Sequence, residues 1–229
     1  MMSITDPAGT APQLGTWEAL TDAICRCIGC PQLVAGRTRV VPGVAPAGAD
    51  VLLVGEAPGV QEDATGTPFV GRAGQLLDSL LTEAGLPRDR VAVTNVVKCR
   101  PPGNRKPRRS EMARCTPWLA RQVEVLDPVL IVTLGGTAAE WALGPGTKIG
   151  AIRGTLQRYR RGEGGGPAGA GDAIGPREWP LLCTYHPSAA IRFGPRGAPM
   201  SALREDLARA AALAAQLRAV SAASPSPGA

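Results

Sequence analysis

Three polar side chains stand where apolar runs of the sequence end. Glu56 and Asn95 close the first two runs, and His186, the only histidine of the chain, follows a later one. The carboxyl ends of parallel strands meet at one edge of a sheet, where open α/β sheets bind their ligands. A lone histidine is more often structural than catalytic. Its coincidence with a carboxylate and an amide at strand ends nevertheless predicts a convergent site.

The loop after the first run is polar, bears acids and contains one aromatic residue. It starts at Glu56 and reaches Phe69 before a helical pattern opens at residues 71–74. Aromatic residues make up only 3% of the chain, so a phenylalanine at this place is a candidate for ligand contact. Its ring offers a face on which a planar group can stack.

Four of the six cysteines have a spacing that suits metal binding. Cys27 and Cys30 form a C-x2-C pair, and Cys99 and Cys115 lie far downstream. Four thiolates from distant segments hold tetrahedral zinc or a [4Fe–4S] cluster. The spacing alone does not separate the two, and general frequency puts zinc slightly ahead. Cys183 lies inside an apolar run and is expected to be a core residue.

Positive charge concentrates in residues 98–109, within a chain whose formal net charge is +6. The stretch holds no acid, and its cations are Lys98, Arg100, Arg105, Lys106, Arg108 and Arg109. Its prolines and glycine predict a loop. A compact basic loop is typical of contact with a phosphate backbone. A basic surface that serves only solubility is an equally good interpretation of an isolated run.

The elements that must position these residues alternate between strands and helices. Short apolar runs, typical of strands covered on both faces, occupy residues 51–55, 91–95, 129–134 and 181–185. Helical patterns lie near residues 74–84, 110–126 and 136–143, and a last helix is predicted at about 199–220. This order predicts an α/β protein with a single three-layer α/β/α domain and a central four-stranded parallel sheet.

Three segments have the composition of unstructured chain. Residues 1–14 predict a disordered N-terminal segment, 221–229 a disordered tail, and 161–177, which are dominated by glycine, a flexible surface insertion. The folded domain is therefore expected at residues 15–220. We find neither a run of about 18 apolar residues that could span a membrane nor a secretory signal. A cytoplasmic monomer is therefore expected.

Five motifs in chain order resemble the family 4 uracil-DNA glycosylases, the iron–sulfur branch of that superfamily. They are GEAPG at 55–59, PFVGRAGQLL at 68–77, TNVVKCRPP at 94–102, LGGTAA at 134–139 and HPS at 186–188. The similarity extends over about residues 27–217. It implies the uracil-DNA glycosylase fold and a monofunctional enzyme of base excision repair. Such an enzyme flips uracil out of single- or double-stranded DNA and hydrolyses its N-glycosidic bond, leaving an abasic site.

The same resemblance implies a [4Fe–4S] cluster as cofactor. Its ligands would be Cys27, Cys30, Cys99 and Cys115. A C-x4-C pair that starts at Cys25 is an alternative, but the distance to the Gly36-Arg37-Thr38 motif of the family favours Cys27. We expect a structural cluster that fastens the basic loop to the rest of the protein.

The resemblance also gives the strand-end residues their roles. The amide of Asn95 has one donor and one acceptor, so it can pair with uracil O4 and N3–H, a pattern that cytosine does not match. An N–H of His186 stabilises the charge that the leaving base acquires on O2. Glu56 orients the attacking water, and Phe69 stacks on the flipped base.

Further residues are expected around this centre. Ala57 is small and apolar, as in the family, and Glu62 is expected to crowd the 5-methyl group of thymine. The expected DNA contacts are Arg100, Arg105, Lys106, Arg108, Arg109, Ser188 and Arg192. Residues 189–192 depart from the family, because bulkier apolar residues usually form the minor-groove wedge there. Relatives that trap DNA covalently use an additional histidine, which this chain lacks.

Two alternatives remain open at the level of the sequence. The chain could be a non-catalytic iron–sulfur module that binds nucleic acid, which would have no need of Glu56 or Asn95. It could also be a glycosylase for another deaminated base, although Asn95 favours uracil.

Overall fold

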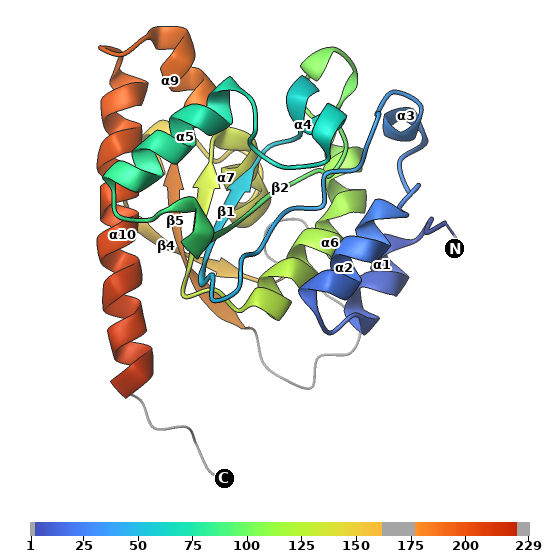
Figure 1. The fold of residues 1–229 in the computed structure, drawn as a ribbon, viewed down its shortest axis with the longest axis horizontal. Coiled ribbons are helices and arrows are strands. Elements are labelled where there is room, and N and C mark those ends of the chain that lie inside the picture. Colours follow the sequence, from blue (N-terminus) through green and yellow to red (C-terminus); the bar gives the residue numbers. More distant parts are fainter. Residues whose placement is uncertain (1–2, 162–176, 224–229) are drawn as a thin grey trace.

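The computed structural model describes residues 3–161 and 177–223 and contains a five-stranded sheet with helices on both faces (Figure 1). The strands are β1 Val51–Gly55, β2 Val91–Asn95, β3 Leu130–Leu134, β4 Leu156–Arg160 and β5 Glu178–Thr184. Their order is β2-β1-β3-β5-β4. Strands β1, β2, β3 and β5 are parallel. The predicted α/β class and the four predicted strands are confirmed.

The edge strand β4 corrects the predicted four-stranded parallel sheet. It pairs antiparallel with β5 and brings the sheet to five strands. Its sequence, Leu-Gln-Arg-Tyr-Arg, contains no apolar run, because the strand has one neighbour and buries only Tyr159. That ring stacks on Trp141, with 4.7 Å between the ring centroids. An edge strand of this kind lacks the pattern by which the central strands are recognised.

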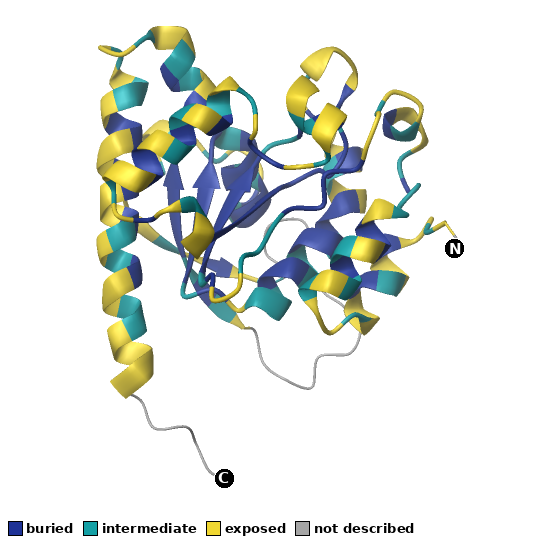
Figure 2. Ribbon diagram, in the orientation of Figure 1, coloured by how far each residue is buried: buried dark blue, intermediate teal, exposed yellow. Residues whose placement is uncertain are grey.

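Longer helices form the two outer layers. Helices α2 Trp17–Cys25, α6 Arg109–Leu126 and α7 Gly136–Leu143 pack on one core, and α5 Arg72–Glu83, α9 Pro187–Phe193 and α10 Ala198–Ala223 pack on the other. Along β1, Leu52 and Val54 enter the first core, whereas Val51 and Leu53 enter the second. Every residue of β1, β2 and β3 is therefore buried (Figure 2), which explains their unbroken apolar runs.

Short elements connect these layers. They are α1 Pro7–Thr10, α3 Pro31–Val34, α4 Val60–Thr65 and α8 Ile149–Ile152, with 3-10 turns at Ala11–Gln13, Arg88–Arg90 and Pro102–Asn104. No helix in residues 3–161 and 177–223 is both long and apolar enough to cross a membrane.

The N-terminal segment is ordered, so the predicted disorder of residues 1–14 is wrong for residues 3–14. The carboxylate of Asp6 accepts a hydrogen bond from Ala8 N at 3.0 Å and caps α1. Ala11 is fully buried, and the carbonyl of Leu14 accepts from Arg121 Nε of α6 at 2.7 Å. Proline and alanine here belong to a helical turn packed on α6, and composition alone does not distinguish such a turn from a disordered tail.

Two other predicted segments fall largely outside the described residues. Most of the predicted insertion, 162–176, and residues 224–229 of the predicted tail are not described. Helix α10 continues to Ala223, so the first three residues assigned to the tail are helical.

Candidate functional site

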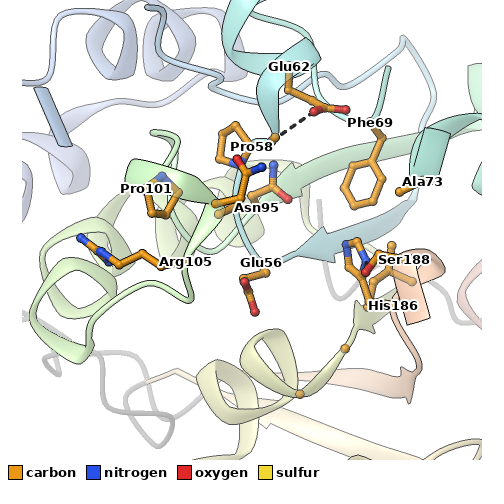
Figure 3. A pocket seen from close by; sticks show the side chains of 16 residues that line it. Glu56, Pro58, Glu62, Phe69, Ala73, Asn95, Pro101, Arg105, His186 and Ser188 are labelled. Atoms are coloured by element: carbon orange, nitrogen blue, oxygen red, sulfur yellow. Dashed lines mark hydrogen bonds between the residues drawn. The ribbon is translucent and has the colours of Figure 1, made fainter. Parts of the chain in front are cut away.

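A pocket of about 340 Å³ lies where β1, β2, β3 and β5 end (Figure 3). Eight of the predicted site residues line it: Glu56, Ala57, Glu62, Phe69, Asn95, Arg105, His186 and Ser188. They come from the ends of β1, β2 and β5 and the loops that follow, as expected for the ligand-binding edge of a parallel sheet. The convergence predicted from three apolar runs is therefore present in the structure.

Asn95 presents an unpaired acceptor to this pocket. Its side chain is 2% exposed, and among the described residues Oδ1 has no hydrogen-bond donor. A buried amide oxygen without a donor is costly, so this atom is suited to an N–H group of a ligand. Gly55 lies beside it in register. A Cβ on Gly55 would come within 2.4 Å of Asn95 Oδ1 and 2.5 Å of Phe69 Cζ, so only glycine leaves room for both side chains.

His186 is held as a neutral hydrogen-bond donor. Its Nδ1 accepts from the backbone N–H of Ser188 at 3.1 Å and lies 2.8 Å from Ser188 Oγ. An accepting Nδ1 puts the proton of the neutral ring on Nε2. Burial lowers the pKa of His186 from 6.5 to about 4, although the negative charge of Glu62 acts in the opposite direction. The imidazole is therefore uncharged at neutral pH and can donate through Nε2.

Phe69 stands in a strained turn that other residues stabilise. Its φ of 55° is left-handed, and its ring lies 5.8 Å from that of His186. A Cβ on Gly74 would be 1.7 Å from the Phe69 carbonyl oxygen, so α5 can begin this close to the turn only with glycine there. Glu62 completes the turn, because Oε1 accepts from Val70 N at 2.9 Å and Gly71 N at 2.8 Å.

Glu62 therefore has a structural role that the sequence analysis did not identify. Its Oε2 also accepts from Gly59 N at 3.1 Å, so one carboxylate joins both ends of the loop between β1 and α5. The residue does line the pocket. Its expected steric effect on the methyl group of thymine stays a prediction.

Glu56 is oriented by a residue from the LGGTAA motif. Thr137, buried in the first turn of α7, donates its hydroxyl hydrogen to Glu56 Oε2. The motif also supplies Gly135, whose φ is 92° and on which a Cβ would lie 3.0 Å from His186 Cβ. The motif thus contributes to the positions of two of the predicted catalytic residues, a role that its sequence did not reveal.

Asn104 lines the pocket but is absent from the sequence prediction. It has a left-handed φ of 56°, and its Oδ1 accepts from Arg100 Nε at 2.7 Å. The available signal was an amide in a Pro-Gly-Asn turn, a residue type that adopts this backbone conformation readily.

The four predicted cysteine ligands line one cavity on the opposite side of the segment after β2. They are Cys27, Cys30, Cys99 and Cys115. Arg37 Nη1 donates to Cys99 Sγ at 2.9 Å, and Trp118 Nε1 donates to Cys27 Sγ at 3.4 Å. Burial raises the pKa of the Cys30 thiol to about 11 and that of Cys115 to about 12, so cations and N–H groups would have to stabilise their thiolates.

The remaining cysteines lie elsewhere. Cys25 is exposed at the end of α2, and Cys183 is fully buried in β5. Among the described residues, no three Cys, His, Asp or Glu side chains are grouped closely enough to bind a single metal ion. The four thiols thus line one cavity, and two of their sulfur atoms, those of Cys27 and Cys99, accept hydrogen bonds. A set of four thiols suits a sulfur-bridged cluster of several metals.

The basic stretch is partly neutralised by acids of the fold. Arg105 donates to both oxygens of Glu111 at 2.9 and 2.6 Å, and this pairing lowers the pKa of the glutamate. Lys106 pairs with Glu140 at 3.0 Å, and Arg108 donates to the side chain of Gln32. The predicted DNA contacts Arg108, Arg109, Ser188 and Arg192 are exposed, whereas Arg100 and Arg105 are half-buried.

Known proteins are similar in sequence to this chain. Residues 42–208 match the Uracil DNA glycosylase superfamily. The type-4 uracil-DNA glycosylase of Thermotoga maritima is 40% identical over 175 residues, covering 76% of this chain and 83% of that protein. The type-4 enzyme of Sulfurisphaera tokodaii is 38% identical over 179 residues, covering 76% and 75%. A type-5 uracil-DNA glycosylase of Pyrobaculum aerophilum is 31% identical over 228 residues, covering 86% and 93%. With these matches and the pocket at the sheet edge, the chain belongs to the uracil-DNA glycosylase superfamily and, within it, to the type-4 family.

Proposed function

We propose that this chain removes uracil from DNA by hydrolysing the N-glycosidic bond, which leaves an abasic site. The observation that carries the proposal is the buried Asn95 Oδ1, which has no hydrogen-bond donor among the described residues and belongs to a side chain that lines a pocket shared with Phe69 and His186. A pocket of about 340 Å³ is large enough for a single flipped base.

Recognition of uracil follows from the two ends of the Asn95 amide. Oδ1 accepts from uracil N3–H, and Nδ2 donates to O4. Cytosine has an unprotonated N3 and an amino group at C4, so both hydrogen bonds would be lost. Asn95 Nδ2 would face the amino group, donor against donor, and Oδ1 would face N3, acceptor against acceptor. Mismatched buried polar groups give strong discrimination, on the order of 10⁴-fold or more. Phe69 supplies a face for stacking.

The leaving group is stabilised by His186. As the glycosidic bond breaks, its electron pair moves into the base and negative charge gathers on O2. The neutral ring donates Nε2–H to that oxygen. A donor of this kind contributes on the order of 10²–10³ in rate.

Glu56 orients the water molecule that hydrolyses the glycosidic bond. Its carboxylate, fixed through Oε2 by Thr137, accepts a hydrogen bond from the water that attacks C1′ of the oxocarbenium-like sugar.

The cysteine cavity suits a [4Fe–4S] cluster held by Cys27, Cys30, Cys99 and Cys115. When bound, the cluster cross-links the N-terminal region, the segment after β2 and helix α6. We expect brown protein with absorption near 400 nm and about four irons per chain. Cys27→Ala should abolish this absorption, and Cys25→Ala is the matched control that should retain it. Colourless wild-type protein with one zinc per chain would contradict the assignment.

Excision is tested with a single-stranded oligonucleotide that contains one uracil. Wild-type protein followed by alkali should cleave the strand at the uracil position, because abasic sites are alkali-labile. A matched strand with cytosine in place of uracil should stay intact. A protein that binds the uracil strand but leaves it intact would be a non-catalytic binding module, and the proposal would fail.

A further inference from the structure

Lys98 is a buried cation close to the proposed base-recognition residue. It is 1% exposed, and it follows Asn95 by three positions. Its Nζ donates to the backbone carbonyl of Asn95 at 2.7 Å and to Thr94 Oγ1 at 2.6 Å. Burying an ammonium is costly unless hydrogen bonds and opposite charge compensate it. The mechanism above makes no use of this residue.

Behind Lys98 lies a network that joins three segments. Thr94 Oγ1 donates to the carbonyl of Pro42 at 3.1 Å, and Gln122 Nε2 of α6 donates to the same oxygen at 2.8 Å. Thr94 and Gln122 are fully buried. The chain also approaches closely at Gly43, where a Cβ would lie 2.8 Å from Thr94 Oγ1. Lys98 thus lies in a rigid polar layer that fixes the carbonyl end of β2.

On its other side, Lys98 lines the cysteine cavity together with Arg37 and Cys115. A [4Fe–4S]²⁺ core bound by four thiolates carries a net charge of −2. Three basic side chains, Lys98, Arg37 and Arg114, line the same cavity, and Arg37 donates directly to Cys99 Sγ. The cluster would therefore supply the opposite charge that the buried ammonium requires.

We propose that Lys98 is a positioning residue that couples the cluster to base recognition, its ammonium balancing the cluster charge while its N–H groups fix the backbone of Asn95. The inference rests on the proposed function of Asn95. It accounts for a cation that lies between a metal-binding cavity and a substrate pocket. It also predicts that the cluster affects uracil excision through the orientation of Asn95, with no electron transfer to substrate.

The test compares Lys98→Met with Lys148→Met, which removes an exposed lysine. Lys98→Met, with iron content near that of wild type, should lose on the order of 10–100-fold in the single-turnover excision rate, the loss usual for groups that orient a ligand. Affinity for uracil-free DNA should be unchanged. The reduction potential of the cluster should become more negative, because a neighbouring cation that favours the reduced form has been removed. Lys148→Met should match wild type in all three measurements.

If Lys98→Met does not fold or load iron, Thr94 provides the second test. Thr94→Val removes one acceptor of the Lys98 ammonium and should lower the excision rate, whereas Thr94→Ser keeps the hydroxyl and should restore it. Iron-loaded Lys98→Met with wild-type rate and potential, or Thr94→Val as active as Thr94→Ser, would overturn the inference. Wild-type protein that leaves uracil in place would instead refute the proposed function.

Discussion

At the scale of single residues, Asn95 and His186 separate binding of DNA from chemistry at the base. Replacing either by alanine should lower the single-turnover excision rate by on the order of 10²–10³, because we propose that each contacts the leaving base. Affinity for DNA should be retained, since phosphate contacts supply most of it. Gln75→Ala, which removes an exposed amide from α5, is the control. Excision by His186→Ala at near the wild-type rate would mean that the site is misplaced.

The pH dependence of excision reports the environment of His186. In the proposed mechanism the neutral ring is the active form, and burial lowers its pKa from 6.5 to about 4. Excision should therefore persist as the pH falls through 6.5 and decline only near pH 4. In the unfolded chain the imidazole takes up its proton already near pH 6.5. The contribution of His186 to the free energy of unfolding is therefore lost as the pH falls from 6.5 to about 4. A half-maximal rate at pH 6.5 would contradict the assigned environment.

Residue types and positions in the sequence predicted much of this site, but not how it is held together. Glu56, Asn95 and His186 could be found because each ends an apolar run. The function of Glu62 as an acceptor for backbone N–H groups could not be found, since it depends on where the turn at Phe69 folds back. Thr137 and Lys98 were missed for the same reason: their partners lie in other segments or in the backbone.

At the scale of elements, α9 presents a side chain that the sequence analysis overlooked. Residues 189–192 lack a bulky exposed apolar group, but Phe193, at the end of the helix that begins after His186, is 66% exposed. Arg192 and Arg196 beside it are also exposed. An exposed apolar side chain flanked by cations, on a helix that begins at the pocket, can insert between stacked bases.

Phe193→Ala should therefore lower excision from duplex DNA more than from single-stranded DNA, because only the duplex must be opened. The expected difference is about 10-fold, equivalent to roughly 1.4 kcal/mol of the unstacking cost. Val220→Ala, which shortens an apolar side chain on α10 that is 64% exposed, is the control. Equal losses on the two substrates would remove Phe193 from the opening step.

The elements themselves were predictable to the extent that they are buried on both sides. The central strands have unbroken apolar runs, whereas β4 and the turns of residues 7–13 each have only one packed side. For such elements the pattern is weak, and the packing partners, β5 and α6, decide the structure.

At the scale of the whole molecule, an ion pair between a partly exposed arginine and a buried aspartate joins α10 to the segment before β4. Arg153 donates to both oxygens of Asp206, each at 3.0 Å, and Thr184 Oγ1 donates to the same carboxylate at 2.7 Å. Thr184 ends β5 and precedes His186 by two residues, so these contacts also hold the strand end that His186 follows. Asp206 is 3% exposed.

Arg153→Met should destabilise the protein by about 3 kcal/mol, because it leaves a buried carboxylate without its cation. Arg204→Met removes an ion pair between the exposed side chains of Arg204 and Glu83 and should cost less than about 1 kcal/mol. Denaturant unfolding of the iron-loaded proteins would measure both. Equal stabilities of the two variants would show that the pair of Arg153 with Asp206 contributes no more than a surface contact.

The hydrogen bond between Ser188 N and His186 Nδ1 has a practical consequence for spectroscopy. Because His186 is the only histidine of the chain, every imidazole signal in a nitrogen-15 NMR spectrum comes from the pocket and needs no assignment. The two ring nitrogens differ widely in chemical shift according to which one carries the proton, so a single spectrum would identify the tautomer. Addition of uracil would then report directly whether the product of the reaction occupies the pocket.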